Sequence, residues 1–174
     1  MKKLLLIILA FAFTMTSNAQ RSRTWSSSQM NNRPWSVEIS TGYQFYTKGG
    51  SGVYAVYLGA QKQLSKHFSL GFTTGSQFPK GGDPIIPVFA DFRGICPIND
   101  SKIDIIGIVR GGLYVNTNKP SWKDFGFDIL PGVQYHATDK LVFLINSGFS
   151  KTFFTGDGYD FDMIPILVGV SFKL

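Results

Sequence analysis

One stretch of the chain decides its fold: Phe125-Gly126-Phe127-Asp128-Ile129-Leu130-Pro131-Gly132-Val133-Gln134-Tyr135. Apolar side chains occupy the odd-numbered positions, whereas glycine, aspartate and glutamine occupy most of the even-numbered ones. Successive side chains of a β-strand point to opposite faces of the sheet. The alternation therefore predicts a strand with one apolar face and one polar, glycine-rich face.

The same alternation recurs along the rest of the chain after residue 34, and no segment there has the periodicity of a helix. We expect eight strands, at 35–46, 53–64, 67–78, 85–96, 102–115, 124–137, 140–153 and 163–174. Turn-forming residues separate them, as in 48–52 and 79–84. This regular meander predicts an all-β domain, an eight-stranded antiparallel up-and-down barrel over 35–174.

The direction of the apolar face distinguishes a membrane barrel from a soluble one. Most strand glycines share the polar phase, and only Gly94, Gly107 and Gly111 fall on the apolar phase. The interior of an eight-stranded barrel is barely wide enough for side chains, so it must alternate small residues with a few large ones. About thirty large apolar side chains would overfill it. We therefore predict that the apolar face points outward into lipid, in a transmembrane barrel.

The N-terminus predicts export. Lys2 and Lys3 precede an apolar run over 4–13 and a small, polar stretch that ends at Ala19, which is the pattern of a cleaved secretory signal peptide, 1–19. The apolar run is too short for a spanning helix, which needs about 20 residues. Residues 20–34 are polar and aperiodic, and we expect a flexible periplasmic leader. Export and a net charge of only +6 argue against nucleic-acid binding.

Two local patterns carry a family resemblance: Pro87-Val88-Phe89-Ala90-Asp91-Phe92-Arg93 and the ending Val168-Gly169-Val170-Ser171-Phe172-Lys173-Leu174. With the eight-strand pattern, they resemble the small outer-membrane β-barrels of diderm bacteria, the class of the OmpA transmembrane domain and OmpX-like proteins. The resemblance implies location in the cell outer membrane and recognition of the last strand by the outer-membrane assembly machinery. Phe172 stands two residues before the terminal Leu174, in the phase of the expected terminal aromatic.

An even number of strands places both termini on the periplasmic side. The turns at 65–66, 97–101 and 138–139 then face the periplasm, and those at 47–52, 79–84, 116–122 and 154–162 face outside.

Charged residues of the polar phase form the first candidate site. They are Glu38, Asp91, Arg93, Asp104, Arg110 and Asp128. Unpaired charges in a narrow lumen are costly, so we expect these groups to pair across strands and to plug the barrel. The alternative is a conducting or substrate-handling path.

Residues at the outer end form a second candidate site. Possible contacts to lipopolysaccharide phosphates are Lys48, Lys80, Lys119, Lys123 and Lys151, although plain loop solubility explains them equally well. Aromatic residues near strand ends are expected to form a membrane-interface girdle: Trp35, Tyr46, Trp122, Phe153 and Tyr159. Turn-flanking aromatics of a soluble protein would give the same pattern.

The sequence shows little that indicates catalysis. His67 and His136 both fall toward the periplasmic end, and we interpret them as structural. Carboxylates at 157–162 suit Ca²⁺, but the spacing of a calcium loop is missing and an ordinary acidic hairpin is the simpler interpretation. We expect no cofactor and no metal.

The hypothesis that follows is a monomeric, non-enzymatic outer-membrane barrel with an envelope-structural, surface-contact or minor permeation role. It would contact outer-membrane lipids and lipopolysaccharide. The alternatives are a soluble, exported, lipocalin-like carrier with the apolar phase inward, and a lipid A-modifying barrel enzyme.

Overall fold

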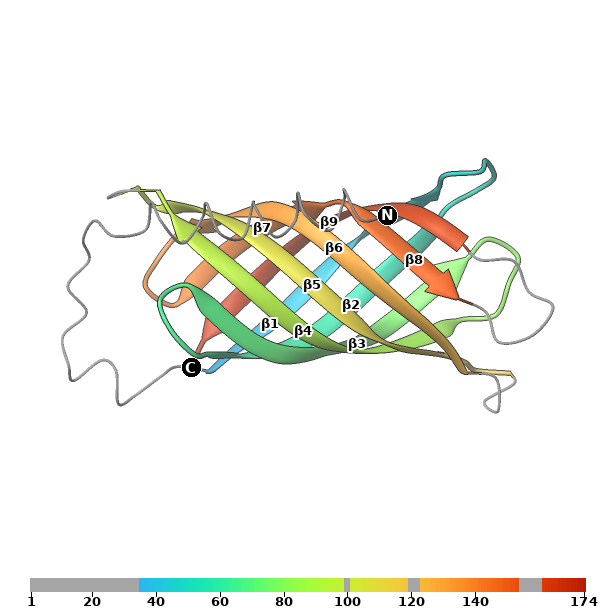
Figure 1. Ribbon diagram of the computed structural model, residues 1–174, viewed down its shortest axis with the longest axis horizontal. Helices are drawn as coiled ribbons and strands as arrows, with labels where there is room; N and C mark the ends of the chain where they lie inside the picture. Colours follow the sequence, from blue (N-terminus) through green and yellow to red (C-terminus); the bar gives the residue numbers. More distant parts are fainter. Residues whose placement is uncertain (1–34, 99–100, 119–122, 154–160) are drawn as a thin grey trace, which may run out of the picture.

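The computed structural model describes residues 35–98, 101–118, 123–153 and 161–174, so the predicted signal peptide and leader lie outside it. The strands are β1 (Trp35–Tyr46), β2 (Val53–Gln63), β3 (Phe68–Pro79), β4 (Ile85–Pro97), β5 (Ile103–Asn116), β6 (Lys123–His136), β7 (Leu141–Ser147), β8 (Phe149–Phe153) and β9 (Phe161–Lys173). Each pairs antiparallel with its neighbours, and β1 pairs with β9, which closes the sheet into a barrel (Figure 1). The predicted boundaries differ from these by no more than two residues.

The predicted strand 140–153 is interrupted at Gly148, which separates β7 from β8. The register with β6 is the same on both sides of the break: the pairs are Gly132–Asn146 and Ile129–Phe149. Proline has no N–H to give to a ladder, and both neighbouring strands carry one here, Pro131 on β6 and Pro165 on β9. The barrel therefore has eight strands, one of them interrupted, and the predicted fold class is confirmed.

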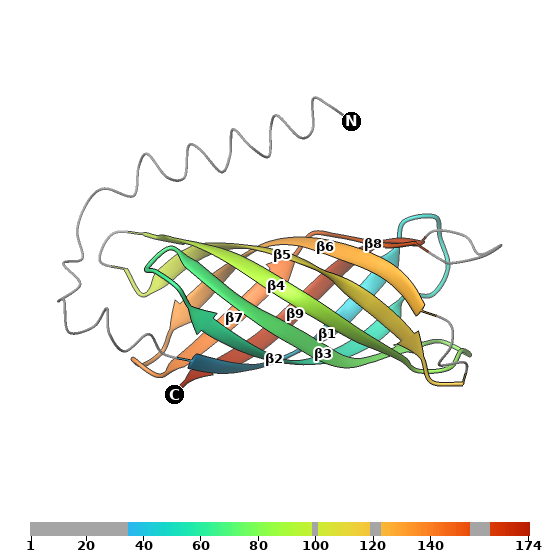
Figure 2. The same cartoon turned by 60° about the horizontal axis from the view of Figure 1, so that its bottom comes forward.

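Both ends of the described chain lie at one end of the barrel (Figures 1 and 2). The backbone N–H of Leu174 donates a hydrogen bond to the carbonyl of Trp35 at 2.8 Å. The β2–β3, β4–β5 and β6–β7 turns lie at this end, which we call the C-terminal end, and the other connections lie at the opposite end. Uninterrupted strands have 11 to 14 residues, and a tilted membrane strand needs about 9–11. Within the described residues, no helix is long and apolar enough to cross a membrane.

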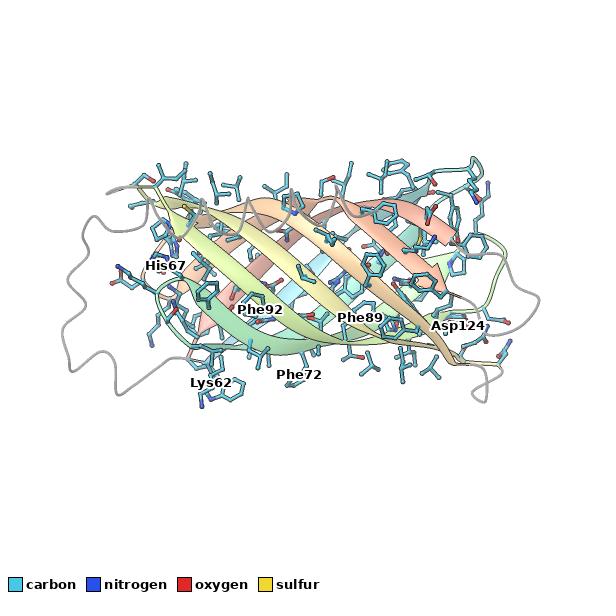
Figure 3. All side chains as sticks on the ribbon, viewed as in Figure 1. Lys62, His67, Phe72, Phe89, Phe92 and Asp124 are labelled. Carbon is cyan, nitrogen blue, oxygen red and sulfur yellow. The ribbon has the colours of Figure 1, made fainter. Side chains whose placement is uncertain are left out.

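The outer wall of the barrel is apolar. Every residue assigned to the apolar phase is exposed or half-buried, and Ile39 and Phe72 are 59% and 56% exposed. Figure 3 shows Phe72 standing off the outer wall, whereas Phe89 of β4 is buried in the bore, 1% exposed. The predicted outward direction of the apolar face is therefore confirmed.

Glycines divide between the two faces as predicted. A Cβ on Gly112 would lie 2.0 Å from the carbonyl oxygen of Val88, because strand curvature brings the neighbouring backbone against its inward face. At Gly107, on the outer face, a Cβ would meet no atom within 4 Å. Only the inward glycines are thus needed for close approach of the strands.

The bore also contains an apolar core, which the alternation of side chains does not predict. Its buried members are Ala55, Tyr57, Phe89, Ile106, Ile108, Tyr114, Leu130, Leu144 and Leu167. They share the phase of the charged residues, and they fill the space that glycines leave, as close packing requires. The interior is therefore a mixed apolar and polar core rather than a lumen of small and ionic residues.

Candidate functional site

The six charged residues of the candidate lumen site all point into the bore, because each lies in the inward phase of its strand. Glu38 comes from β1, Asp91 and Arg93 from β4, Asp104 and Arg110 from β5, and Asp128 from β6. All are buried except Glu38, whose side chain is 12% exposed. The structure divides them into three groups along the bore.

Arg110 is the centre of the first group. Its Nε donates to Asp128 Oδ2, and Asp128 is its register partner on β6. The guanidinium lies 4.4 Å from the ring centroid of Tyr57 and 5.1 Å from that of Phe89. A guanidinium that is both ion-paired and packed on aromatic faces fixes its neighbours in one arrangement.

Glutamines extend this group toward the opposite end. The Tyr57 hydroxyl accepts hydrogen bonds from Gln44 Nε2 and, at 2.8 Å, from Gln77 Nε2. Tyr57 was not among the predicted site residues, because a tyrosine in an alternating strand fits either face. Its inward position follows from its sharing a phase with Gln61 on β2.

Asp91 is held by neutral donors. Its Oδ2 accepts from Gln61 Nε2 at 2.9 Å and from Thr73 Oγ1. In the β4–β5 ladder it lies opposite Arg110, whose Nε is used by Asp128. Asp91 therefore links β4 to β2 and β3 by hydrogen bonds, and it lies beside the Arg110 group in the ladder.

Arg93 and Glu38 form the second group. Arg93 Nη2 lies 2.6 Å from Glu38 Oε2, and their strands β4 and β1 do not pair with each other. This ion pair therefore crosses the bore instead of following the sheet.

The third group lies at the C-terminal end. Asp104 Oδ2 accepts from Gln134 Nε2 at 2.7 Å and lies 2.6 Å from His136 Nε2. The other histidine, His67, contacts the carbonyl of Ile95 through Nδ1 at 3.1 Å. In the described part of the chain, no group of three His, Cys, Asp or Glu side chains is arranged to hold a metal ion.

The predicted outer lysines are placed in part. Lys48 and Lys80 are exposed in turns of the opposite end. Lys151 Nζ lies 3.0 Å from Asp162 Oδ1 and 5.3 Å from the ring centroid of Phe153. Lys119 lies outside the described residues, as do 157–160 of the acidic loop, and the Lys123 side chain is not described.

The predicted girdle aromatics lie near strand ends where they are described. Trp35 is exposed at the C-terminal end, and Tyr46 packs on Phe161 at the opposite end, with ring centroids 5.1 Å apart. Phe153 stacks on Phe125 at 6.4 Å. Trp122 and Tyr159 lie outside the described residues.

No family model and no curated protein matches the chain. Among solved structures, Neisserial surface protein A superposes with a TM-score of 0.60 at 11% identity, over 81% of this chain and 96% of that chain. A de novo designed transmembrane β-barrel gives 0.53 at 14%, over 81% and 95%. The N-terminal β-barrel domain of Pseudomonas aeruginosa OprF gives 0.50 at 14%, over 80% and 97%. The closed barrel of this chain is thus the fold of the small eight-stranded outer-membrane β-barrels.

Proposed function

We propose that this protein is an integral outer-membrane β-barrel without enzymatic activity, which does not conduct and has an envelope-structural or surface-contact role. The observation that carries the proposal is the sealed bore inside an apolar wall. Tyr57, Phe89, Leu130 and Leu167, from β2, β4, β6 and β9, are each 1% exposed. Water does not reach these side chains, although they come from strands around the whole barrel.

The apolar wall supports membrane insertion over a soluble carrier. Soluble monomers rarely expose contiguous apolar patches larger than a few hundred Å². Here exposed apolar side chains are found on every strand from β1 to β9, including Leu58, Val109 and Val168. A lipocalin-like carrier would instead need this set of side chains inside.

The packed interior supports a closed barrel over a permeation role. Opening a path would require Arg110 to leave Asp128 and the rings of Tyr57 and Phe89 together. Separating a buried ion pair costs about 3–5 kcal/mol, because each charge then lacks its partner.

The proposal includes an orientation. Export by the signal peptide and insertion through β9 by the assembly machinery place the C-terminal end in the periplasm. The opposite end then faces outside, where Lys48 and Lys80 would contact lipopolysaccharide phosphates. The barrel acts as a monomer.

Two measurements test the proposal. The protein should fractionate with outer membranes, resist extraction by urea, and migrate faster on unheated than on heated gels. The refolded barrel should give no channel steps in a planar bilayer. Recovery from the soluble periplasm, or steady conductance by a barrel that shows the gel shift, would contradict the insertion and the closed state respectively.

A further inference from the structure

Each of the three turns at the C-terminal end carries a lysine next to the strand that leaves this end. Lys102 and Lys140 directly precede β5 and β7, and Lys66 stands two residues before β3. Lys102 and Lys140 are exposed, and Lys66 is half-buried. Among the described residues, none of the three has an ion-pair partner. Three separate turns thus place a cationic group around the rim.

A fourth lysine of this end lies on the outer wall. Lys62 of β2 is the register partner of Trp35 on β1, and its Nζ lies 5.6 Å from the Trp35 ring centroid. Both side chains are exposed, and Figure 3 shows Lys62 pointing away from the barrel at this end. Tryptophan and lysine side chains both combine an apolar part with a polar end, and both are typical of the boundary between lipid tails and headgroups. We call Lys62, Lys66, Lys102 and Lys140 the lysine collar.

The opposite end does not carry the same excess of positive charge. Its described lysines are accompanied by carboxylates of Asp83, Asp124 and Asp162, and Lys151 pairs with Asp162 at 3.0 Å. At the C-terminal end, the exposed carboxylates of the described residues are those of Asp139 and the terminal Leu174. Positive charge is therefore concentrated at one end of the barrel.

We infer that the lysine collar binds the headgroup phosphates of anionic glycerophospholipids in the leaflet that surrounds the C-terminal end. Ammonium groups donate charge-assisted hydrogen bonds to phosphate oxygens, and basic residues close to a membrane are attracted to its anionic lipids. The inference rests on the proposed function, because it requires an inserted barrel.

The distribution of the collar favours lipid over an acidic macromolecule as its partner. Its members lie on β2 and in the β2–β3, β4–β5 and β6–β7 turns, which are spread around the barrel (Figure 1). A protein docked at this end would contact one side of the rim, whereas lipids surround all of it. Lys62 also lies on the wall beside Trp35, where only lipid has access in an inserted barrel.

Quenching of Trp35 fluorescence tests the inference locally. In a Trp25→Phe, Trp122→Phe background, Trp35 is the single tryptophan of the chain. The barrel is inserted into phosphatidylcholine vesicles with a minor share of phosphatidylglycerol, and one or the other lipid is brominated near the headgroup. We expect phosphatidylglycerol to associate about threefold more strongly than phosphatidylcholine at low salt. The preference should fall to near equality at high salt, because salt screens exposed charges.

Two variants with the same loss of charge locate the effect. Replacing the four collar lysines by glutamine should abolish the preference. Replacing Lys48, Lys80, Lys119 and Lys123 by glutamine removes four charges from the opposite end and should leave it unchanged. Equal loss in both variants would overturn the inference, because net charge alone would then explain the lipid preference.

The remaining outcomes separate the inference from the proposed function. Quenching by each lipid in proportion to its share of the bilayer, in a barrel that shows the gel shift, would overturn the inference alone, and an acidic periplasmic macromolecule would then be the partner to test. Absence of quenching by either lipid, together with absence of the gel shift, would contradict membrane insertion and remove both proposals.

Discussion

Arg93 and Glu38 join opposite parts of the barrel wall: Nη2 and Oε2 are 2.6 Å apart, although β4 and β1 are not neighbours in the sheet. Their side chains are only 7% and 12% exposed. The pair therefore acts as a strut across the bore, and its contribution can be compared with that of an exposed pair in the same protein.

Glu38→Gln should destabilise the folded barrel by about 3 kcal/mol, because it leaves the buried Arg93 guanidinium without its ion-pair partner. The measurement is urea unfolding in phosphatidylcholine vesicles, followed by tryptophan fluorescence. Asp162→Asn is the matched control: it breaks the Lys151–Asp162 pair, whose side chains are 25% exposed, and should cost less than about 1 kcal/mol. Equal costs would show that the strut contributes no more than a surface pair.

The stability cost of placing an arginine on the outer wall should depend on its depth in the membrane. Val109 stands halfway along β5 and Ile103 begins it, and both are exposed. Val109→Arg should cost about 2–4 kcal/mol, whereas Ile103→Arg should cost about 0–1 kcal/mol, since arginine near the interface reaches headgroups and water. The same unfolding experiment checks both values. Identical small costs would mean that this face does not contact the hydrocarbon core.

Adding one methyl group at two strand glycines should have opposite effects on folding. A Cβ on Gly132 would lie 2.3 Å from the carbonyl oxygen of Ile145, whereas a Cβ on Gly107 would have nothing within 4 Å. Gly132→Ala should reduce the yield of folded barrel on unheated gels, because backbone on the neighbouring strand must shift. Gly107→Ala should fold as the wild type does. Normal folding of Gly132→Ala would contradict the close inward approach of β6 and β7.

The alternation of side chains was sufficient to predict the strands, because a period of two is a local property. It could not tell Leu130 from Asp128, since both share the inward phase of β6, so the apolar part of the core was missed. The alternation also does not predict which side chains on different strands are in contact. Asp104 is predicted to face the bore and His136 to lie toward the periplasmic end, but their contact at 2.6 Å depends on the β5–β6 register, which pairs Asp104 with Gln134, two positions from His136.

The Arg93–Glu38 ion pair across the bore could not be predicted from the alternation either. Its two residues are recognisable as inward charges, but a partner across the bore depends on the tilt and stagger of all eight strands. The break at Gly148 needed similar information, because it depends on Pro131 and Pro165 arriving beside the same residue from the two neighbouring strands.

The sealed bore gives the last prediction. Tyr57 and Phe89 both pack against the Arg110 guanidinium, with ring centroids 4.4 and 5.1 Å away. Replacing both by alanine removes two side chains that exclude water and leaves Arg110 and Asp128 accessible from the bore. We expect channel steps in planar bilayers, together with a loss of stability of about 3–5 kcal/mol for Phe89→Ala alone.

Phe72→Ala is the control for this experiment. It removes a phenylalanine ring from the outer wall, where Phe72 is 56% exposed, and should give no channel steps. The gel shift of each variant shows that the barrel tested is folded. If the folded Tyr57→Ala, Phe89→Ala variant gives no channel steps, the bore must be closed by more than this layer of side chains. The charged groups on either side of the layer would then be what blocks the bore.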